Sequence, residues 1–312
     1  MFYTLSPALR EIPLQDVSPQ QLCVGYLTGE ELAAVAAHLG YPGHVVAECL
    51  GDQDKYRNTV DVYESFTFGI VTFVNPARVY EASDRLAFFL QPNLLLWVSL
   101  RDLDKSSKAV FEQALLRLRP ETATLEKLLY ALLENSISKD AQTLAQWELE
   151  ISALEESLFA QGKTPHRFQE SIFTHKRRLL LLQDYYEQLI DVGEELQENE
   201  NDIFAEGTLH YFALFSAKAG RLMGTVQRLL AELNELRAAH QAALDYAQNR
   251  IMKIFTVITS VFLPLTLIVG WYGMNFTYMP ELDWQMGYPF VFVLSLVTVL
   301  VCLLFFKKKN LL

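Results

Sequence analysis

The sequence predicts an α+β membrane protein with an N-terminal α/β domain on the cytoplasmic side, a long helical hairpin, a stalk helix and two C-terminal transmembrane helices. Three observations lead to this fold class. Residues 254–271 and 288–306 are uncharged, and each run is close to the roughly 20 residues that span a bilayer. Residues 225–263 contain neither glycine nor proline, as a long helix requires. Residues 1–120 instead mix helical and strand-like patterns.

Residues 1–120 are predicted to form the α/β domain. A helical pattern covers Gly29–Leu39, and the aromatic, β-branched runs at 63–74 and 85–99 alternate as strands do. Turn signals at 41–43, 75–76 and 91–93 separate these elements. We find no glycine-rich phosphate loop, no nucleophile–base arrangement and no HExxH-type helix in the sequence, so we expect a protein that is not an enzyme.

Residues 121–253 are predicted to form long cytoplasmic helices. One helix is expected over 121–160, where apolar residues recur at helical spacing, and a second from about Arg167 to Glu198, so that the two form an antiparallel hairpin. A third helix runs from near Thr208 to Tyr272, and at 1.5 Å per residue it would be about 100 Å long, which makes it a stalk. Acidic clusters on the hairpin fit either a solvated face or a cation-attracting surface.

The predicted segments after the stalk are a first transmembrane helix, an outer loop, a second transmembrane helix and a basic tail, at residues 254–272, 273–287, 288–306 and 307–312. Arg250 and Lys253 precede the first span and three lysines follow the second, whereas the loop has no lysine or arginine. By the positive-inside rule, both termini are cytoplasmic and the loop is outside. No basic-then-apolar signal opens the sequence, so membrane insertion is expected to rely on these two spans.

Charge and cysteine counts limit the function classes. The formal net charge is −11, and three lysines against two acids from Ile254 onward leave −12 on residues 1–253. Such an acidic portion argues against nucleic acid as a partner and fits a surface that gathers cations, although acidity also serves solubility. Cys23, Cys49 and Cys302 are too few and too scattered for a disulfide framework or a CxxC metal site.

A stripe of small and polar residues follows the stalk and the first span at steps of three and four. Its members are Asn234, Ala238, Gln241, Asp245, Asn249, Met252, Thr259, Leu263, Thr266 and Gly270. Spacing alone supports two interpretations equally: a packing seam between helices, or the lining of a pore that several copies build around an axis. Two membrane helices cannot enclose a water-filled path, so a transport function demands a ring of identical subunits.

The most specific motif follows the first span and reads Gly273-Met274-Asn275. The run YGMNFTYMPELDWQMGYPF at 272–290, with FLPLTLIVGW before it and the terminal FFKKKNLL, resembles the CorA family of divalent-cation transporters, within the GMN-motif superfamily. The match is close over residues 249–312 and looser upstream. The resemblance implies a funnel-shaped homopentamer in the lipid bilayer of the plasma (inner) membrane. It would carry Mg²⁺, often with Co²⁺ and Ni²⁺, into the cytoplasm.

The resemblance also implies roles for individual residues. The selectivity filter consists of Gly273, Met274 and Asn275. The pore-lining residues are Asn249, Met252, Thr259, Leu263, Thr266 and Gly270. Among these, Leu263 and Met252 occupy the places of apolar gates. The charges of the outer loop and the inner mouth are Glu281, Lys307, Lys308 and Lys309.

The chemistry of Mg²⁺ suits a filter of neutral oxygens. The ion dehydrates reluctantly, so a ring of Asn275 amides can hold it through its water shell and still release it. Local alternatives stay open, with Asn275 as a helix cap and Thr266 bonded to its own helix. Asp245 lies four residues before Asn249, and we expect a ring of its carboxylates to gather cations at the cytoplasmic exit. The alternative for Asp245 is a salt bridge to Arg250.

Two other functions compete with magnesium transport. One is a zinc transporter of the same superfamily, with or without coupling to protons. Glu281 within MPEL favours magnesium, and the six histidines are scattered outside the pore segments. The other is a membrane-anchored scaffold, which leaves the motif and the stripe without a purpose. No resident cofactor is expected. The sensor of intracellular cation stays open, with Glu81, Asp84 and Asp202 as candidates.

Overall fold

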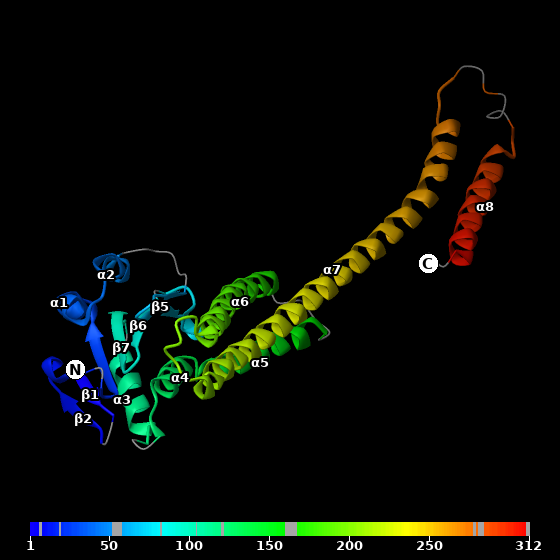
Figure 1. The fold of residues 1–312 in the computed structure, drawn as a ribbon. Coiled ribbons are helices and arrows are strands. Elements are labelled where there is room, and N and C mark those ends of the chain that lie inside the picture. The colour runs from blue at the N-terminus through cyan, green and yellow to red at the C-terminus, as the bar shows by residue number, and fades with distance from the viewer. Residues whose placement is uncertain are drawn as a thin grey trace. The chain divides into compact units, whose positions relative to one another are not determined.

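The computed structural model describes residues 1–5, 8–18, 20–51, 58–81, 83–103, 105–119, 122–159, 167–276, 279 and 284–309. They belong to two compact units, Met1–Glu235 and Leu236–Leu312, whose elements are labelled in Figure 1. One helix, α7 (His210–Tyr272), has residues in both units, which confirms the expected stalk helix.

The first unit is built on a seven-stranded sheet of order β2-β1-β3-β7-β6-β5-β4. The strands are β1 (Phe2–Thr4), β2 (Arg10–Ile12), β3 (Cys23–Thr28), β4 (Thr59–Val62), β5 (Thr67–Phe73), β6 (Asp84–Gln91) and β7 (Leu94–Arg101). At the centre β3 and β7 are parallel, and the other described neighbours are antiparallel. The run predicted as strand at 63–74 becomes β5 only from Thr67, because Tyr63 N donates to Phe66 O (2.9 Å) in the turn after β4. The run at 85–99 divides into β6 and β7 at residues 92–93.

Two helices, α1 (Gly29–Leu39) and α2 (Gly43–Leu50), pack on one face of the sheet (Figure 1). The core under them includes Cys23, Leu32, Val45, Phe68, Phe89 and Leu96. The predicted bounds of α1 are confirmed, and local signals set them. Thr28 and Glu31 form a reciprocal capping box at its start, and Gly40 ends it with a φ of 81°.

The opposite face of the sheet meets α3 (Ser107–Arg117) and α4 (Leu125–Ser136). The Tyr26 ring lies 5.5 Å from that of Phe111 between ring centroids, and its hydroxyl is 2.8 Å from Ser107 Oγ. The buried sheet therefore has α1 and α2 on one face and α3 and α4 on the other.

A glycine in β5 makes room for an aromatic ring of the neighbouring strand. Gly69 pairs directly with Phe88, a fully buried residue, and a Cβ on Gly69 would lie 2.3 Å from Phe88 Cζ. We therefore expect Gly69→Ala to destabilise the sheet by about 1–3 kcal/mol, because the buried ring has no free volume to move into. Circular dichroism melting of the full chain in detergent measures this effect. Gly43→Ala is the matched control, since a Cβ there meets nothing within 4 Å, and an equal loss in both variants would contradict the prediction.

Long helices follow the sheet. The prediction of a single helix over 121–160 is wrong. The chain forms α4 and then α5 (Asp140–Phe159), with a break at residues 137–139. The break places the Asp140 carboxylate, 3% exposed, where it accepts a 3.0 Å hydrogen bond from the Tyr186 hydroxyl of α6 (Phe168–Glu198). The expected second helix at 167–198 is confirmed as α6, which ends at Asn199 with a φ of 50°. The described short 3₁₀ turns are η1 (Leu14–Asp16), η2 (Pro76–Arg78) and η4 (Glu206–Thr208).

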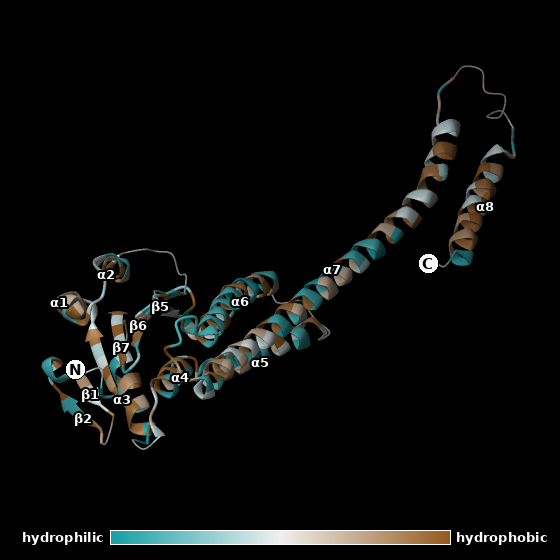
Figure 2. Cartoon of the chain, viewed as in Figure 1, coloured by the Kyte–Doolittle hydropathy of each residue, from teal (hydrophilic) through white to brown (hydrophobic). Residues whose placement is uncertain are grey.

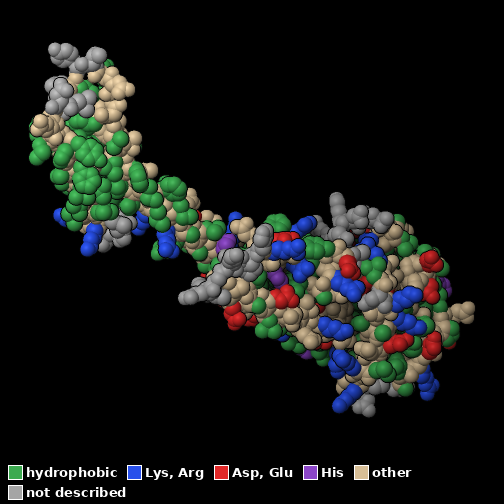
Figure 3. Space-filling view, turned by 180° about the vertical axis from the view of Figure 1, so that it is seen from behind, with side chains coloured by type: hydrophobic (Ala, Val, Ile, Leu, Met, Phe, Trp, Pro, Cys, Tyr) green, Lys and Arg blue, Asp and Glu red, His purple; other side chains and the backbone are tan. Residues whose placement is uncertain are grey.

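The second unit contains the C-terminal part of α7 and all of α8 (Gly287–Lys308). Both helices are long and apolar enough to cross a membrane, as the two uncharged runs predicted. In Figure 2, α8 is hydrophobic except at its C-terminal end, and Figure 3 shows apolar side chains gathered over this pair. In the most apolar stretch of α7, 0% of the residues are buried. In that of α8, 6% of the residues are buried. Apolar surface left open on this scale requires lipid or further protein against it.

Candidate functional site

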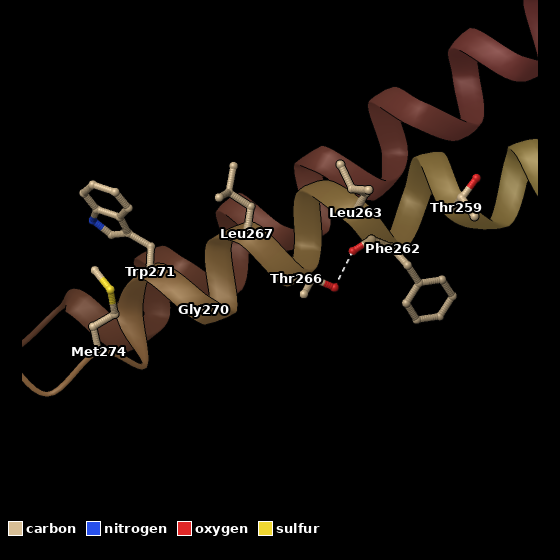
Figure 4. Close-up of a pocket in the computed structure, with 8 residues that line it drawn as sticks. All are labelled: Thr259, Phe262, Leu263, Thr266, Leu267, Gly270, Trp271 and Met274. Atoms are coloured by element: carbon tan, nitrogen blue, oxygen red, sulfur yellow. Dashed lines mark hydrogen bonds between the residues drawn. The ribbon is translucent and has the colours of Figure 1, made fainter.

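A shallow hollow of about 680 Å³ runs along α7 within the second unit (Figure 4). Its lining residues are Thr259, Phe262, Leu263, Thr266, Leu267, Gly270, Trp271 and Met274. Four of the six predicted pore-lining residues are in this set, together with Met274 of the predicted filter. They recur at steps of three and four, so they share one broad face of the helix.

Sequence reasoning misses three residues of this hollow, Phe262, Leu267 and Trp271. They are apolar, so a search for small and polar positions passes over them. A signal was nevertheless present, because Leu267 and Trp271 follow Leu263 at successive four-residue steps. The hollow is therefore mostly apolar, with hydroxyl groups at two positions along the helix, Thr259 and Thr266.

The two threonines of the hollow bond to their own helix. Thr266 Oγ1 donates to Phe262 O (2.8 Å, dashed in Figure 4), and Thr259 Oγ1 lies 2.8 Å from Phe255 O. The local alternative for Thr266, a bond to its own helix, is thus present. With each hydroxyl hydrogen engaged, the oxygen lone pairs remain as acceptors. The water molecules around a cation point their hydrogens outward, so acceptors of this kind suit a hydrated cation.

The C-terminal end of α7 carries the predicted filter. Gly273 N donates to Val269 O (2.9 Å) as the helix ends at Tyr272, and the Asn275 side chain is exposed with no hydrogen-bond partner among the described residues. Glycine is required at 273, because a Cβ there would lie 2.9 Å from Val269 O. The last carbonyls of a helix lack intrahelical donors and form the negative end of its dipole, so this end attracts cations.

The structure separates the members of the predicted filter. Met274 lines the hollow along α7, whereas Gly273 lines a second hollow of about 550 Å³ between the ends of α7 and α8. The other residues of this second hollow are Val269, Tyr272, Trp284, Gln285, Gly287, Tyr288, Phe290 and Val291. The filter role of Gly273 stays a prediction, because a filter of this kind would be built by several copies of the chain.

The remaining predicted residues of α7 lie nearer its middle and outside both hollows. Asn249 and Met252 are exposed on the helix surface. Asp245 is also exposed, and its Oδ1 accepts a 2.9 Å hydrogen bond from Gln241 Nε2 one turn earlier. In the part of the chain that the structure describes, Asp245 forms no salt bridge to Arg250.

The predicted mouth charges lie at the C-terminal end of α8. Lys307 and Lys308 are in its last turn and Lys309 caps it, with Lys309 N donating to Phe305 O (3.1 Å). Their ammonium groups are exposed, where positive charge offsets the negative end of the helix dipole. Glu281 lies outside the described residues.

The candidate sensors of intracellular cation lie in the first unit. Glu81 pairs with Arg78 at 3.5 Å, and Asp84 Oδ1 accepts from Leu103 N at 2.8 Å. Asp202 sits in a turn with a φ of 53°. Over the described ranges, no group of three or more histidine, cysteine or acidic side chains is arranged to hold a metal ion.

Known sequences resemble this chain over most of its length. The profile of the family described as "CorA-like Mg2+ transporter protein" matches residues 24–308. The cobalt/magnesium transport protein CorA of Thermotoga maritima is 28% identical over 263 residues, which cover 81% of this chain and 72% of that protein. The magnesium transport proteins CorA of Yersinia pseudotuberculosis and Escherichia coli K12 are 45% and 44% identical over 84 residues, 27% of this chain and 27% of each relative.

Solved structures share the fold. The complete CorA magnesium transporter of Methanocaldococcus jannaschii superposes with a TM-score of 0.76 at 19% identity, covering 100% of this chain and 98% of that chain. The cytoplasmic domain of ZntB from Vibrio parahaemolyticus gives 0.56 at 12% identity, over 78% of this chain and 97% of that chain. Since the profile match covers far more than half of the sequence, the chain belongs to the family of CorA-like Mg²⁺ transporter proteins.

Proposed function

We propose that this protein is a transporter of divalent metal cations, with Mg²⁺ as its principal ion, and that it carries them across the plasma (inner) membrane. The observation that carries the proposal is the hollow along α7, where hydroxyl acceptors and apolar side chains recur directly below the Gly-Met-Asn motif. The named relatives are cobalt and magnesium transport proteins, and Co²⁺ and Ni²⁺ are the expected further substrates.

The hollow is open on one side, so one chain cannot enclose a water-filled path. Identical copies arranged around an axis would close it, with α7 of each copy on the inside and α8 towards lipid. We propose a homopentamer, as the family resemblance implies. The uncharged, uncovered surfaces of the two membrane-length runs support burial against other copies and lipid.

The amide of Asn275 is proposed as the selecting group. In a ring, the free amides would surround the axis just beyond the negative ends of the α7 helices. Mg²⁺ holds its waters strongly, so neutral oxygens that accept from this water shell allow both binding and release. The waters of the ion would next meet the hydroxyl oxygens of Thr266 and Thr259.

Apolar positions are proposed as gates. Leu263 and Met252 each expose more than half of their surface in the isolated chain, 73% and 57%. In a ring, apolar side chains of this size can narrow the path until water leaves it, and a hydrated ion then cannot pass. A small rotation of α7 would reopen the path.

Charges at the two ends of the spans support an orientation in the membrane. Lys307, Lys308 and Lys309, with Arg250 and Lys253, place positive charge at one end of both spans, so we propose that both termini are cytoplasmic. Glu281 in the outer loop is proposed to gather cations outside. The ring of Asp245 carboxylates is proposed to gather them at the cytoplasmic exit.

Ion flux into proteoliposomes tests the proposal directly. The purified full chain is reconstituted, and uptake of Mg²⁺, Co²⁺, Ni²⁺ and Zn²⁺ is followed with trapped indicator dyes under an inside-negative potential, with and without a proton gradient. We expect Mg²⁺ uptake that depends on the potential and not on the proton gradient. Empty liposomes are the control.

Two other outcomes identify the competing functions. Zn²⁺ uptake without Mg²⁺ uptake, enhanced by a proton gradient, would favour a zinc transporter of the same superfamily. The absence of uptake for all four ions would leave a membrane-anchored scaffold. The histidines cannot decide between these ions beforehand, since no histidine lines either of the two described hollows.

A further inference from the structure

A proline lies inside α7, between Leu263 and Thr266 of the hollow. Pro264 has no N–H, so the carbonyl of Ser260, four residues earlier, loses its usual helical donor. Inside a membrane no water is available to replace that donor, and an unpaired carbonyl is costly. The threonine hydroxyls nearby do not serve it, because Thr256, Thr259 and Thr266 bond to the carbonyls of Met252, Phe255 and Phe262.

A side chain from the other helix of the unit supplies the donor. Cys302 of α8 is half-buried, and its Sγ lies 3.7 Å from Ser260 O. A thiol is a weak donor, so this contact contributes little free energy and is easy to break. The bond therefore joins α8 to α7 at the point where α7 is least supported by its own hydrogen bonds.

The position of this contact matters for the residues beyond it. Leu263 is adjacent to Pro264, and Thr266 and Gly270 follow it towards the motif. Without the bond between positions 260 and 264, the direction of this last part of α7 depends on packing against α8. A donor from α8 to the carbonyl of Ser260 would therefore hold the hollow and the motif in position.

We propose that Cys302 is a positioning residue for cation passage: its thiol pins α8 to the unpaired carbonyl at the proline break and so holds the motif-proximal part of α7 in place. The inference rests on the proposed transport function for its role, but the hydrogen bond itself can be tested without any flux.

A double-mutant cycle with Pro264 provides the test. Cys302→Val removes the donor at similar volume, and we expect Mg²⁺ uptake in proteoliposomes to fall about threefold or more, whereas Cys302→Ser keeps a donor and restores it. In a Pro264→Ala background residue 264 regains its N–H and can satisfy Ser260 O, so Cys302→Val should then have no further effect. Thr298→Val is the matched control on α8, since its hydroxyl bonds to Leu294 O (2.8 Å) of its own helix and to no other described residue.

Thermal unfolding of the detergent-solubilised full chain repeats the same cycle without transport. Cys302→Val should lower the midpoint in the wild-type background and not in the Pro264→Ala background. Equal effects in both backgrounds, no effect in either, or a Cys302→Ser variant that behaves like Cys302→Val would overturn the inference. If wild type carries no divalent cation but the unfolding cycle shows coupling, the contact stands while its role in transport fails together with the proposed function.

Discussion

Replacing Asn275 with alanine is expected to lower Mg²⁺ uptake by reconstituted protein on the order of 100-fold. The amide is exposed and unpartnered among the described residues beyond the end of α7, so it is available to the ion's water shell. A net hydrogen bond contributes about 0.5–1.5 kcal/mol. At the low end, the five amides that the proposed homopentamer would lose amount to about 2.5 kcal/mol, which is close to two orders of magnitude in an equilibrium or a rate.

The way in which Mg²⁺ uptake changes depends on the residue that replaces Asn275. Asn275→Asp keeps an oxygen but adds charge, so we expect tighter Mg²⁺ binding with slow release, seen as saturation at lower concentration and a lower maximal rate. Asn275→Ala should lower the rate at every concentration. Gln227→Ala removes an exposed amide from the same helix in the first unit and should leave uptake unchanged. Mg²⁺ uptake that survives Asn275→Ala, in protein that elutes and melts like wild type, would refute the selecting role.

Elements marked by local signals could be predicted from the sequence. The bounds of α1 follow from a capping box at Thr28 and a left-handed glycine at 40, both formed by neighbours in the chain. The two membrane-length helices follow from uncharged runs, because a bilayer selects for composition and length alone. The long α7 follows from the absence of glycine and proline over 225–263.

Features set by distant partners could not be predicted in this way. The first residue of α5 after the break, Asp140, has its partner 46 residues later, where the Tyr186 hydroxyl donates to the buried carboxylate. No local residue marks that break, since the segment has neither proline nor glycine. The parallel pairing of β3 with β7 likewise joins strands more than 60 residues apart. Strand alternation identifies each strand but not its neighbour.

Periodicity along one helix predicted which residues share a face, whereas their role in cation passage stays a prediction. Thr259, Leu263, Thr266 and Gly270 meet in one hollow, as their spacing requires. Gly273 and Met274 line different hollows because they follow the end of the helix, where the 3.6-residue period stops. The contact of Cys302 with Ser260 O needs a register between two helices, which no single-helix pattern contains.

Replacing Asp140 with asparagine is expected to stabilise the first unit at pH 8 and to have little effect at pH 4. Burial raises the pKa of this carboxyl from 3.8 to about 7, against the lowering influences of the Tyr186 hydroxyl and of Lys218. The groups that face it are Tyr185 and Tyr186 of α6 and Lys218 of α7, whose ammonium is paired with Glu134 of α4. Lys218 is therefore not free to neutralise the carboxylate.

The sign follows from which state holds the proton. Below about pH 4 both the folded and the unfolded carboxyl are protonated, and the stability linked to the raised pKa is fully present. Between about pH 4 and 7 the unfolded chain loses this proton first, so folding stability falls as the pH rises, and above pH 7 the loss is complete. A pKa difference of this size corresponds to about 4 kcal/mol, or on the order of 10 °C in the melting temperature of a unit of this length.

Asparagine removes the titration and keeps an oxygen that can accept from Tyr186. The stability difference between Asp140→Asn and wild type should therefore widen from pH 4 to pH 7 and stay constant above it. Melting of both full-length proteins in detergent across this range measures the difference, and Asp184→Asn, at an exposed position on α6, should show no such change. A constant difference at all pH values would mean that Asp140 stays ionised in the folded protein. The buried carboxylate would then need a cation closer than Lys218, and the packing of α5 against α6 and α7 would be held by charge instead of by a proton.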